Sequence, residues 1–170
     1  MNQINIKYYK SPVGEIILGS YEGKLCLADW RSRKMRSTID SRIQKALSAE
    51  YLEKSSEVIE ETIVQLEEYF SHQRKVFDIP LLMLGTDFQK SVWKGLVQIP
   101  YGKTLSYLEL SKNIGNEKAV RAVANANGAN AISILIPCHR IIGHDGSLTG
   151  YAGGLSVKKK LLDLEQDAVS

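Results

Sequence analysis

Cys138 is the residue of this chain whose sequence neighbours most favour chemistry. It lies in the apolar run of residues 134–142 (ILIPCHRII), which two basic side chains interrupt. Adjacent basic groups favour the thiolate, which is the nucleophilic form of cysteine. Pro137 removes a backbone donor and keeps its predecessor extended, so we expect a turn where the sulfur is presented. A small buried cysteine that only packs is the open alternative.

The other candidate ligands do not form a metal-binding pattern. Zinc sites in proteins use about four ligands at characteristic spacings. This chain has two cysteines, and its three histidines, His72, His139 and His144, are scattered. Cys26 lies in a strand-like pattern and is expected to pack, and His144 is expected in a surface loop. We expect free thiols rather than a disulfide.

Composition and charge indicate an ordinary soluble protein that acts inside the cell. Of the 170 residues, 44% are apolar and 24% charged, enough for one domain or two small ones. There is no apolar run near the roughly 20 residues of a membrane span and no apparent signal peptide, so we expect a cytoplasmic protein without membrane contact. Residues up to Gly85 carry 12 basic and 12 acidic side chains, and those from Thr86 carry 10 and 7. The excess positive charge lies in the second part, where a polyanion could bind.

The chain is expected to fold as two domains, residues 1–84 and 85–170. Residues 6–30 alternate and turn like hairpins, and residues 31–54 are compatible with a helix. Residues 56–70 repeat apolar side chains on one helix face, with acidic residues on the other. A new helix begins after Thr86 or Asp87, either of which can cap it.

Two short helical patterns follow, at residues 105–113 and 116–125, with a turn at 114–115. This is helix-turn-helix spacing, which many helical hairpins share. The second pattern surrounds Arg121 with alanines, among them Ala119, Ala122 and Ala126. Small residues let a helix approach another body closely, and the arginine could fill a gap in it or reach phosphate. A packed internal helix whose arginine extends to solvent is the alternative. A final helix is expected at residues 156–165.

Seven segments of the second half together resemble one family, the O6-alkylguanine-DNA alkyltransferases (methylated-DNA–protein-cysteine methyltransferases). They occur in the family's order and spacing between Gly85 and Glu165. In this chain they read GTxFQxxVW from Gly85, IPxG from Ile99, SY at residues 106–107, AVRAV from Ala119, IPCHR from Ile136, GYxGG from Gly150 and LLxxE from Leu161. The resemblance implies a mixed α/β (α+β) fold. A small ribonuclease H-like sheet-plus-helix domain would precede a mostly helical domain of winged helix-turn-helix type.

The resemblance also implies a chemical role for each matching residue. Cys138 would attack the alkyl carbon on guanine O6 and keep the alkyl group as a thioether. His139 would deprotonate the thiol through a water, and Glu165 would orient that histidine. Tyr107 would donate a hydrogen bond to the purine ring, and the backbone at Ala152 would donate to O6. Each molecule would react once, with no metal, nucleotide or reducing cofactor.

The implied partner is double-stranded DNA that contains O6-alkylguanine, bound through its minor groove by a monomer. The target nucleotide must leave the stack before a sulfur atom can reach it. Arg121 would fill the vacated space, and Asn130 would tie the recognition segment to the cysteine turn. The DNA-contacting set also includes Ala119, Ala122 and Ala126. The pocket for the alkylated base would be formed by Pro137, Ile141, Tyr151, Ala152 and Gly153.

Three other functions remain open at this stage. A cysteine hydrolase could use Cys138, His139 and Glu165, although it would need an oxyanion hole and turnover. A damage sensor could bind alkylguanine without repairing it, but relatives of that kind lack the cysteine. A structural winged-helix module would bind DNA without any reaction.

Overall fold

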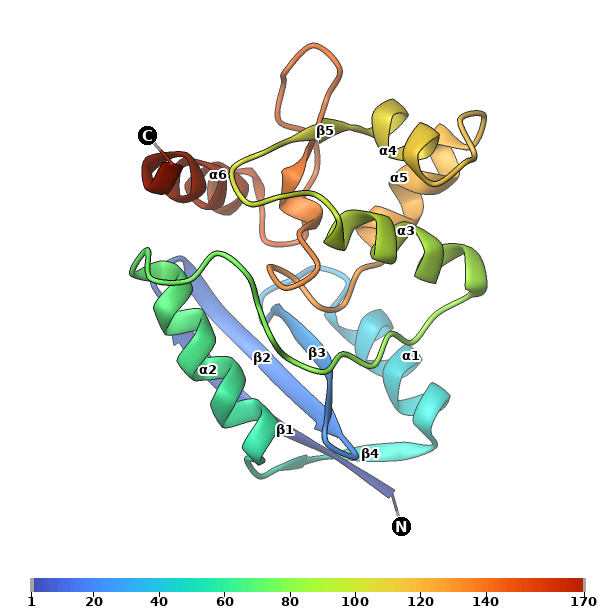
Figure 1. The fold of residues 1–170 in the computed structure, drawn as a ribbon. Coiled ribbons are helices and arrows are strands. Elements are labelled where there is room, and N and C mark those ends of the chain that lie inside the picture. Colours follow the sequence, from blue (N-terminus) through green and yellow to red (C-terminus); the bar gives the residue numbers. More distant parts are fainter. Residues whose placement is uncertain (1, 170) are drawn as a thin grey trace. The chain divides into compact units, whose positions relative to one another are not determined.

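The structure, a computed structural model, describes residues 2–169 and, within that range, the side chains up to residue 167. The chain divides into two compact units, Met1–Leu84 and Gly85–Ser170 (Figure 1). Among the helices of residues 2–169, none is long and apolar enough to cross a membrane. The mixed α/β fold class predicted from the sequence is confirmed.

The first unit is built on a four-stranded sheet of order β3-β2-β1-β4. The strands β1 (Asn2–Ser11), β2 (Gly14–Tyr21) and β3 (Lys24–Trp30) pair as successive antiparallel hairpins, as the alternating pattern predicted. Residues 80–82 run beside β3, where the Leu25 amide donates to the Pro80 carbonyl at 2.8 Å. The segment that leaves this unit is therefore tied to its sheet.

Residues 31–54 form a helix followed by a strand, and the strand was missed. Helix α1 (Arg36–Leu47) ends at Ser48, whose φ of +47° turns the chain into β4 (Ala49–Glu53). Strand β4 pairs in parallel with β1 at the edge of the sheet. Because only Ala49 in this strand is buried, it lacks the apolar alternation that marks a strand in the sequence.

Helix α2 (Glu57–Phe70) confirms the predicted amphipathic helix. The Ser56 hydroxyl caps it by accepting a hydrogen bond from the Ile59 amide at 3.3 Å. Ile59, Leu66 and Tyr69 are fully buried, and the helix packs against β1, β2 and β3 (Figure 1). The apolar stripe thus supplies the core of this unit.

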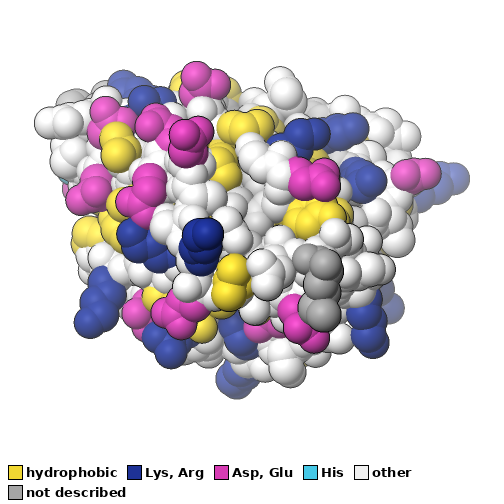
Figure 2. Space-filling view, turned by 90° about the horizontal axis from the view of Figure 1, so that it is seen from below, with side chains coloured by type: hydrophobic (Ala, Val, Ile, Leu, Met, Phe, Trp, Pro, Cys, Tyr) yellow, Lys and Arg dark blue, Asp and Glu magenta, His cyan; other side chains and the backbone are white. Residues whose placement is uncertain are grey.

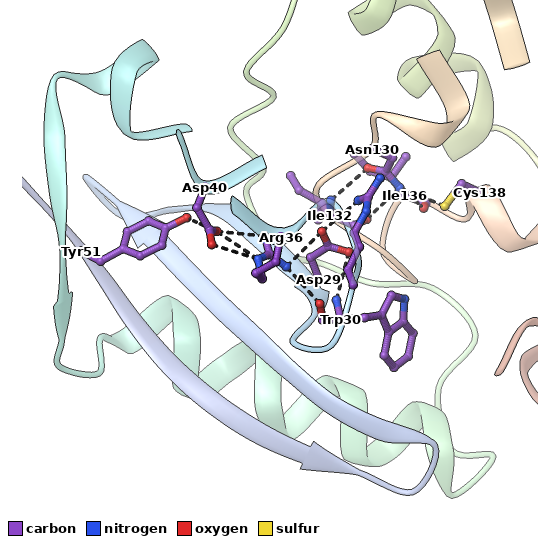
Figure 3. Close-up of polar contacts among 10 residues, drawn as sticks. Asp29, Trp30, Arg36, Asp40, Tyr51, Asn130, Ile132, Ile136 and Cys138 are labelled. Carbon is purple, nitrogen blue, oxygen red and sulfur yellow. Dashed lines mark hydrogen bonds and ion pairs between the residues drawn. The ribbon is translucent and has the colours of Figure 1, made fainter. Parts of the chain in front are cut away.

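A buried charge network fastens α1 to the sheet (Figure 3). Asp29 on β3 is fully buried and binds Arg33 at 2.9 Å and Arg36 at 3.2 Å. Arg36 also binds Asp40 at 2.9 Å, and the Tyr51 hydroxyl on β4 donates to Asp40 at 2.7 Å. Each buried charge has an opposite partner, which is the condition for placing charges away from water.

The second unit begins with α3 (Asp87–Val97), capped as the sequence predicted. Thr86 accepts from the Gln89 amide while the Gln89 side chain accepts from the Thr86 amide, a complete capping box. Buried Trp93 donates its indole N–H to the Ala126 carbonyl at 2.8 Å. This bond joins α3 to the later helix α5 (Val120–Gly128).

The helix-turn-helix pair is present, but both helices begin later than predicted. Residues Leu105–Ser106 form the short strand β5, after which α4 (Tyr107–Asn113) is capped by Ser106. Residues 116–119 form a turn before α5, closed by the Ala119 amide on the Asn116 carbonyl at 3.0 Å. The exposed polar residues that were predicted to begin the second helix lie in this turn instead.

The remaining elements of this unit are short. Strand β6 (Ile141–Ile142) pairs in parallel with β5 and is followed by a loop over residues 143–154. Helix α6 (Leu155–Val169) begins one residue before the predicted start and extends beyond the predicted end. On the face of the molecule drawn in Figure 2, several acidic side chains gather at the upper left, and basic side chains are spread over the rest of the view.

Candidate active site

Cys138 lies on a single 3-10 turn, η1 (Cys138–Arg140), where a turn was predicted. The Pro137 carbonyl accepts the Arg140 amide at 3.0 Å and closes this turn. Residues 130–141 are buried throughout, and Ile134 has a φ of +73°, which branched side chains rarely adopt. The apolar run before β6 is thus a buried, tightly turned segment, and the sulfur is presented by backbone turns.

Asn130 holds this segment in place and contacts the sulfur (Figure 3). Its Nδ2 donates to the Ile136 carbonyl at 3.0 Å and lies 3.3 Å from Cys138 Sγ. Its Oδ1 accepts from the Ile132 amide at 2.9 Å. Asn130 is buried, so it acts on the cysteine turn rather than on a surface that DNA could reach. A donor aimed at sulfur stabilises the thiolate more than the thiol.

His139, Arg140 and Glu165 form one buried network. His139 Nε2 lies 2.7 Å from Glu165 Oε2. Arg140 binds both carboxylate oxygens of Glu165, at 2.8 and 3.1 Å, and its third donor reaches the Ile99 carbonyl at 2.7 Å. Sequence reasoning assigned no role to Arg140, although an arginine in a buried run requires a buried acceptor. The forked guanidinium makes Glu165 the shared partner of two consecutive residues.

The charges of this network fix the tautomer of the histidine. Burial alone would raise the pKa of Glu165, but His139 and Arg140 lower it well below its usual range, so the carboxylate only accepts. Burial lowers the pKa of His139 more than its bond to Glu165 raises it, so the ring is neutral near pH 7. Nε2 therefore carries the proton. Nδ1 is buried without a hydrogen-bond partner in the described part of the chain, and its lone pair can accept a proton.

Lys158 brings a second buried cation to the site. It belongs to three consecutive lysines of α6, to which sequence reasoning assigned no role, and it is fully buried and donates to the Thr149 carbonyl at 3.1 Å. Burial lowers the pKa of Lys158, and the nearby Cys138 sulfur opposes that shift. Helical spacing could have indicated this burial, because Lys158, Leu161 and Glu165 follow one another at intervals of three and four residues and so share the inner face of α6.

Two tyrosines lie around this centre. The Tyr151 ring stands edge-on to the His139 ring, with centroids 6.5 Å apart. The Tyr107 hydroxyl, at the start of α4, lies 3.2 Å from the Thr149 hydroxyl. Both tyrosines are half-buried. The predicted Tyr107 is thus linked to the centre through Thr149, a residue that the sequence did not single out.

The other predicted pocket residues divide by burial. Pro137 and Ile141 are buried at the two ends of the cysteine turn. Ala152 and Gly153 are half-buried, and the turn that contains them is closed by the Gly154 amide on the Tyr151 carbonyl at 2.9 Å. Ala152 and Gly153 are therefore more accessible than Pro137 and Ile141.

The predicted DNA-contacting residues of α5 differ in exposure. Arg121 and Ala122 are exposed and Ala119 is partly so. Ala126 is buried, because its turn packs on Trp93 and its carbonyl accepts the indole N–H. The prediction that the Ala126 side chain contacts DNA is therefore wrong.

The described residues contain no group of three or more His, Cys, Asp and Glu placed to hold a metal ion. Cys26 is buried in β3, and neither it nor Cys138 is in a disulfide. Burial raises the pKa of Cys26 to about 12, so this thiol stays protonated at neutral pH. Its predicted packing role is consistent with that environment.

Comparison with known proteins identifies two matching family profiles. Residues 87–167 match the 6-O-methylguanine DNA methyltransferase DNA binding domain. Residues 4–83 match the ribonuclease-like domain of 6-O-methylguanine DNA methyltransferase. Together these profiles span nearly the whole chain.

Individual relatives agree with these profiles over the full length. A methylated-DNA–protein-cysteine methyltransferase of Methanosarcina acetivorans is 46% identical, covering 92% of this chain and 95% of the relative. The constitutive enzyme of that name from Bacillus subtilis is 38% identical, covering 95% and 96%. A crystal structure of Mycobacterium tuberculosis OGT in complex with DNA matches with a TM-score of 0.82 and 36% identity, covering 98% and 94%. The chain therefore belongs to the 6-O-methylguanine DNA methyltransferase family.

Proposed function

We propose that this protein repairs O6-alkylguanine in double-stranded DNA by moving the alkyl group to Cys138. The observation that carries the proposal is the buried set of Asn130, Cys138, His139 and Glu165, in which a donor faces the sulfur and a proton acceptor is left on the neighbouring ring. In the reaction the Cys138 sulfur forms a bond to the alkyl carbon while the carbon–O6 bond breaks. The electron pair leaves with guanine, which takes up one proton.

The thiol proton leaves through His139. Nδ1 accepts it by way of a water, and the imidazolium that forms is stabilised by the Glu165 carboxylate at 2.7 Å. Arg140 keeps Glu165 ionised and fixed in orientation. Lys158 adds positive charge beside the sulfur, which favours the thiolate.

The alkylated nucleotide is bound outside the DNA stack, between the Tyr151 loop and the start of α4. Tyr107 donates a hydrogen bond to the purine ring, and the backbone near Ala152 donates to O6 as charge develops there. The exposed Arg121 fills the space that the nucleotide leaves, and the small side chain of Ala122 lets α5 enter the minor groove. The protein acts on DNA as a monomer, with the residues of 85–170 making these contacts.

The hydrolase, damage-sensor and structural alternatives lack comparable support. The relatives named above are methyltransferases, and the cysteine that a sensor would lack is present and contacted by Asn130. A cysteine hydrolase would form a thioester on Cys138, which water must hydrolyse in each cycle with the help of an oxyanion hole. The proposed reaction instead ends with a stable carbon–sulfur bond, so one molecule is consumed for each alkyl group.

The decisive experiment is intact mass and peptide mapping after incubation with a duplex containing O6-methylguanine. We expect one methyl group in place of one hydrogen, on the Cys138 peptide, with a yield that stops at one per molecule. Cys138→Ala should give no adduct, while Cys26→Ala should react like the parent. Repeated turnover, or an adduct on another residue, would refute the proposal.

A second experiment tests the role of Arg121. Arg121→Ala should slow repair of duplex DNA far more than reaction with the free modified base, because the free base requires no extrusion from a stack. Lys118→Ala, another exposed basic residue nearby in the sequence, is the matched control and should reduce duplex binding only modestly. Equal losses on both substrates for Arg121→Ala would remove the proposed role.

A further inference from the structure

Thr149 links the two sides of the proposed base pocket. It lies in the loop between β6 and α6, outside the segments that carry the family resemblance. Its hydroxyl lies 3.2 Å from the hydroxyl of Tyr107 on α4, and its carbonyl accepts the buried Lys158 ammonium of α6 at 3.1 Å. One residue thus contacts both a proposed hydrogen-bond donor to the base and the cation beside the cysteine.

We infer that Thr149 is a positioning residue that directs the single proton of Tyr107 toward the alkylated base. The inference rests on the proposed function, because it assigns a partner to Tyr107 in that reaction. A phenol has one proton to donate, whereas its oxygen can also accept. If Tyr107 donates to the purine ring, the Thr149 hydroxyl acts as the donor to Tyr107. That bond polarises the phenol O–H and strengthens its donation to the departing guanine.

The backbone of Thr149 is held well enough for this role. Lys158 is fully buried and fixes the Thr149 carbonyl from the first turns of α6. On one side of Thr149, the Gly143 amide donates to the Ser147 carbonyl at 2.8 Å. On the other, the Gly154 amide closes the turn that contains Ala152. The hydroxyl is therefore presented to Tyr107 from a loop that is pinned on both sides.

The test is a double-mutant cycle on the single-turnover rate constant for methyl transfer from O6-methylguanine duplex DNA. Thr149→Val removes the hydroxyl with little change of shape and should lower the maximal rate constant about fivefold, with unchanged half-saturating DNA concentration. Thr149→Ser keeps the hydroxyl and should stay within about twofold of the parent. In a protein that already carries Tyr107→Phe, Thr149→Val should cause no further loss. Thr38→Val, at an exposed threonine of α1, is the control.

Two results would overturn the inference. One is an unchanged rate constant for Thr149→Val, and the other is an equal loss with and without the Tyr107 hydroxyl, which would mean that Thr149 acts through something else. If Thr149→Val does not fold, as judged by its near-ultraviolet circular dichroism, Thr149→Ala takes its place in the same cycle. Absence of a methyl adduct in the parent protein would refute the proposed function itself and is scored separately.

Discussion

The bond network of Arg140 gives a prediction about stability that the structure makes quantitative. Arg140→Met removes three hydrogen bonds and leaves the Glu165 carboxylate, 1% exposed, with His139 as its remaining partner in this network. Breaking one side of a buried ion pair costs about 3–5 kcal/mol. A typical domain is stable by about 5–15 kcal/mol, so the variant should lose a large part of its free energy of unfolding.

The chain offers a clean assay for this loss. It contains two tryptophans, Trp30 in the first unit and Trp93 in the second. In a Trp30→Phe background, the fluorescence of Trp93 during urea unfolding reports on the unit that contains Arg140. Arg121→Met, at an exposed arginine of the same unit, is the control and should change the free energy of unfolding by less than about 0.5 kcal/mol.

The combination of Arg140→Met with Glu165→Gln separates a lost ion pair from lost packing. Once the arginine is absent, neutralising Glu165 removes the unmatched buried charge. The double variant should therefore be more stable than the sum of the two single losses predicts, by about 1–3 kcal/mol. Additive losses, or a change below about 0.5 kcal/mol for Arg140→Met alone, would refute the assignment of Arg140 as the charge partner of Glu165.

Three further outcomes are expected from the environments of single residues. Iodoacetamide at neutral pH should label Cys138 and not Cys26 in the folded protein, because burial raises the pKa of Cys26 to about 12. Peptide mapping checks this, and both cysteines should be labelled once the protein is unfolded in denaturant. The single-turnover transfer rate should remain level as the pH falls to about 6.5, which is the ordinary pKa of histidine, and should decline only below that pH. The reason is that burial lowers the pKa of His139 and keeps the ring neutral. A decline centred above about pH 6.5 would contradict this. Asn130→Ala should slow transfer by at least about tenfold through loss of the donor to the sulfur, with Asn2→Ala, exposed on β1, unchanged in the same assay.

The elements that the sequence predicted correctly are those whose signals are local. The hairpins of β1 to β3, the apolar stripe of α2 and the Thr86 cap of α3 each depend on residues that are close to one another in the sequence. Strand β4 was missed because its stability comes from pairing with β1, more than 40 residues away in the sequence. Nothing within Ala49–Glu53 itself marks that partnership.

The site divides along the same line. The turn at Cys138 was predicted from Pro137, whereas the link from Asn130 to that turn was implied only by resemblance, and its contact with the sulfur was not predicted. The burial of Arg140 and Lys158 was not predicted, because a charged residue is ordinarily assigned to the surface until its partner is known. Those partners, Glu165 and the Thr149 carbonyl, are brought near by the fold of residues 85–170.

The buried charges of the site bear on the proposed single reaction of Cys138. Arg140 and Glu165 balance one another, and His139 is neutral, so Lys158 is the charge of this site that has no ion pair among the described residues. A thiolate at Cys138 supplies one, and a buried ammonium beside the sulfur is stabilised in return. In the proposed reaction, alkylation would replace that thiolate with a neutral thioether, and the Thr149 carbonyl would remain as the hydrogen-bond partner of Lys158 among the described residues. If the reaction proceeds as proposed, the cation that favours the Cys138 thiolate would therefore destabilise the protein once the alkyl group is in place.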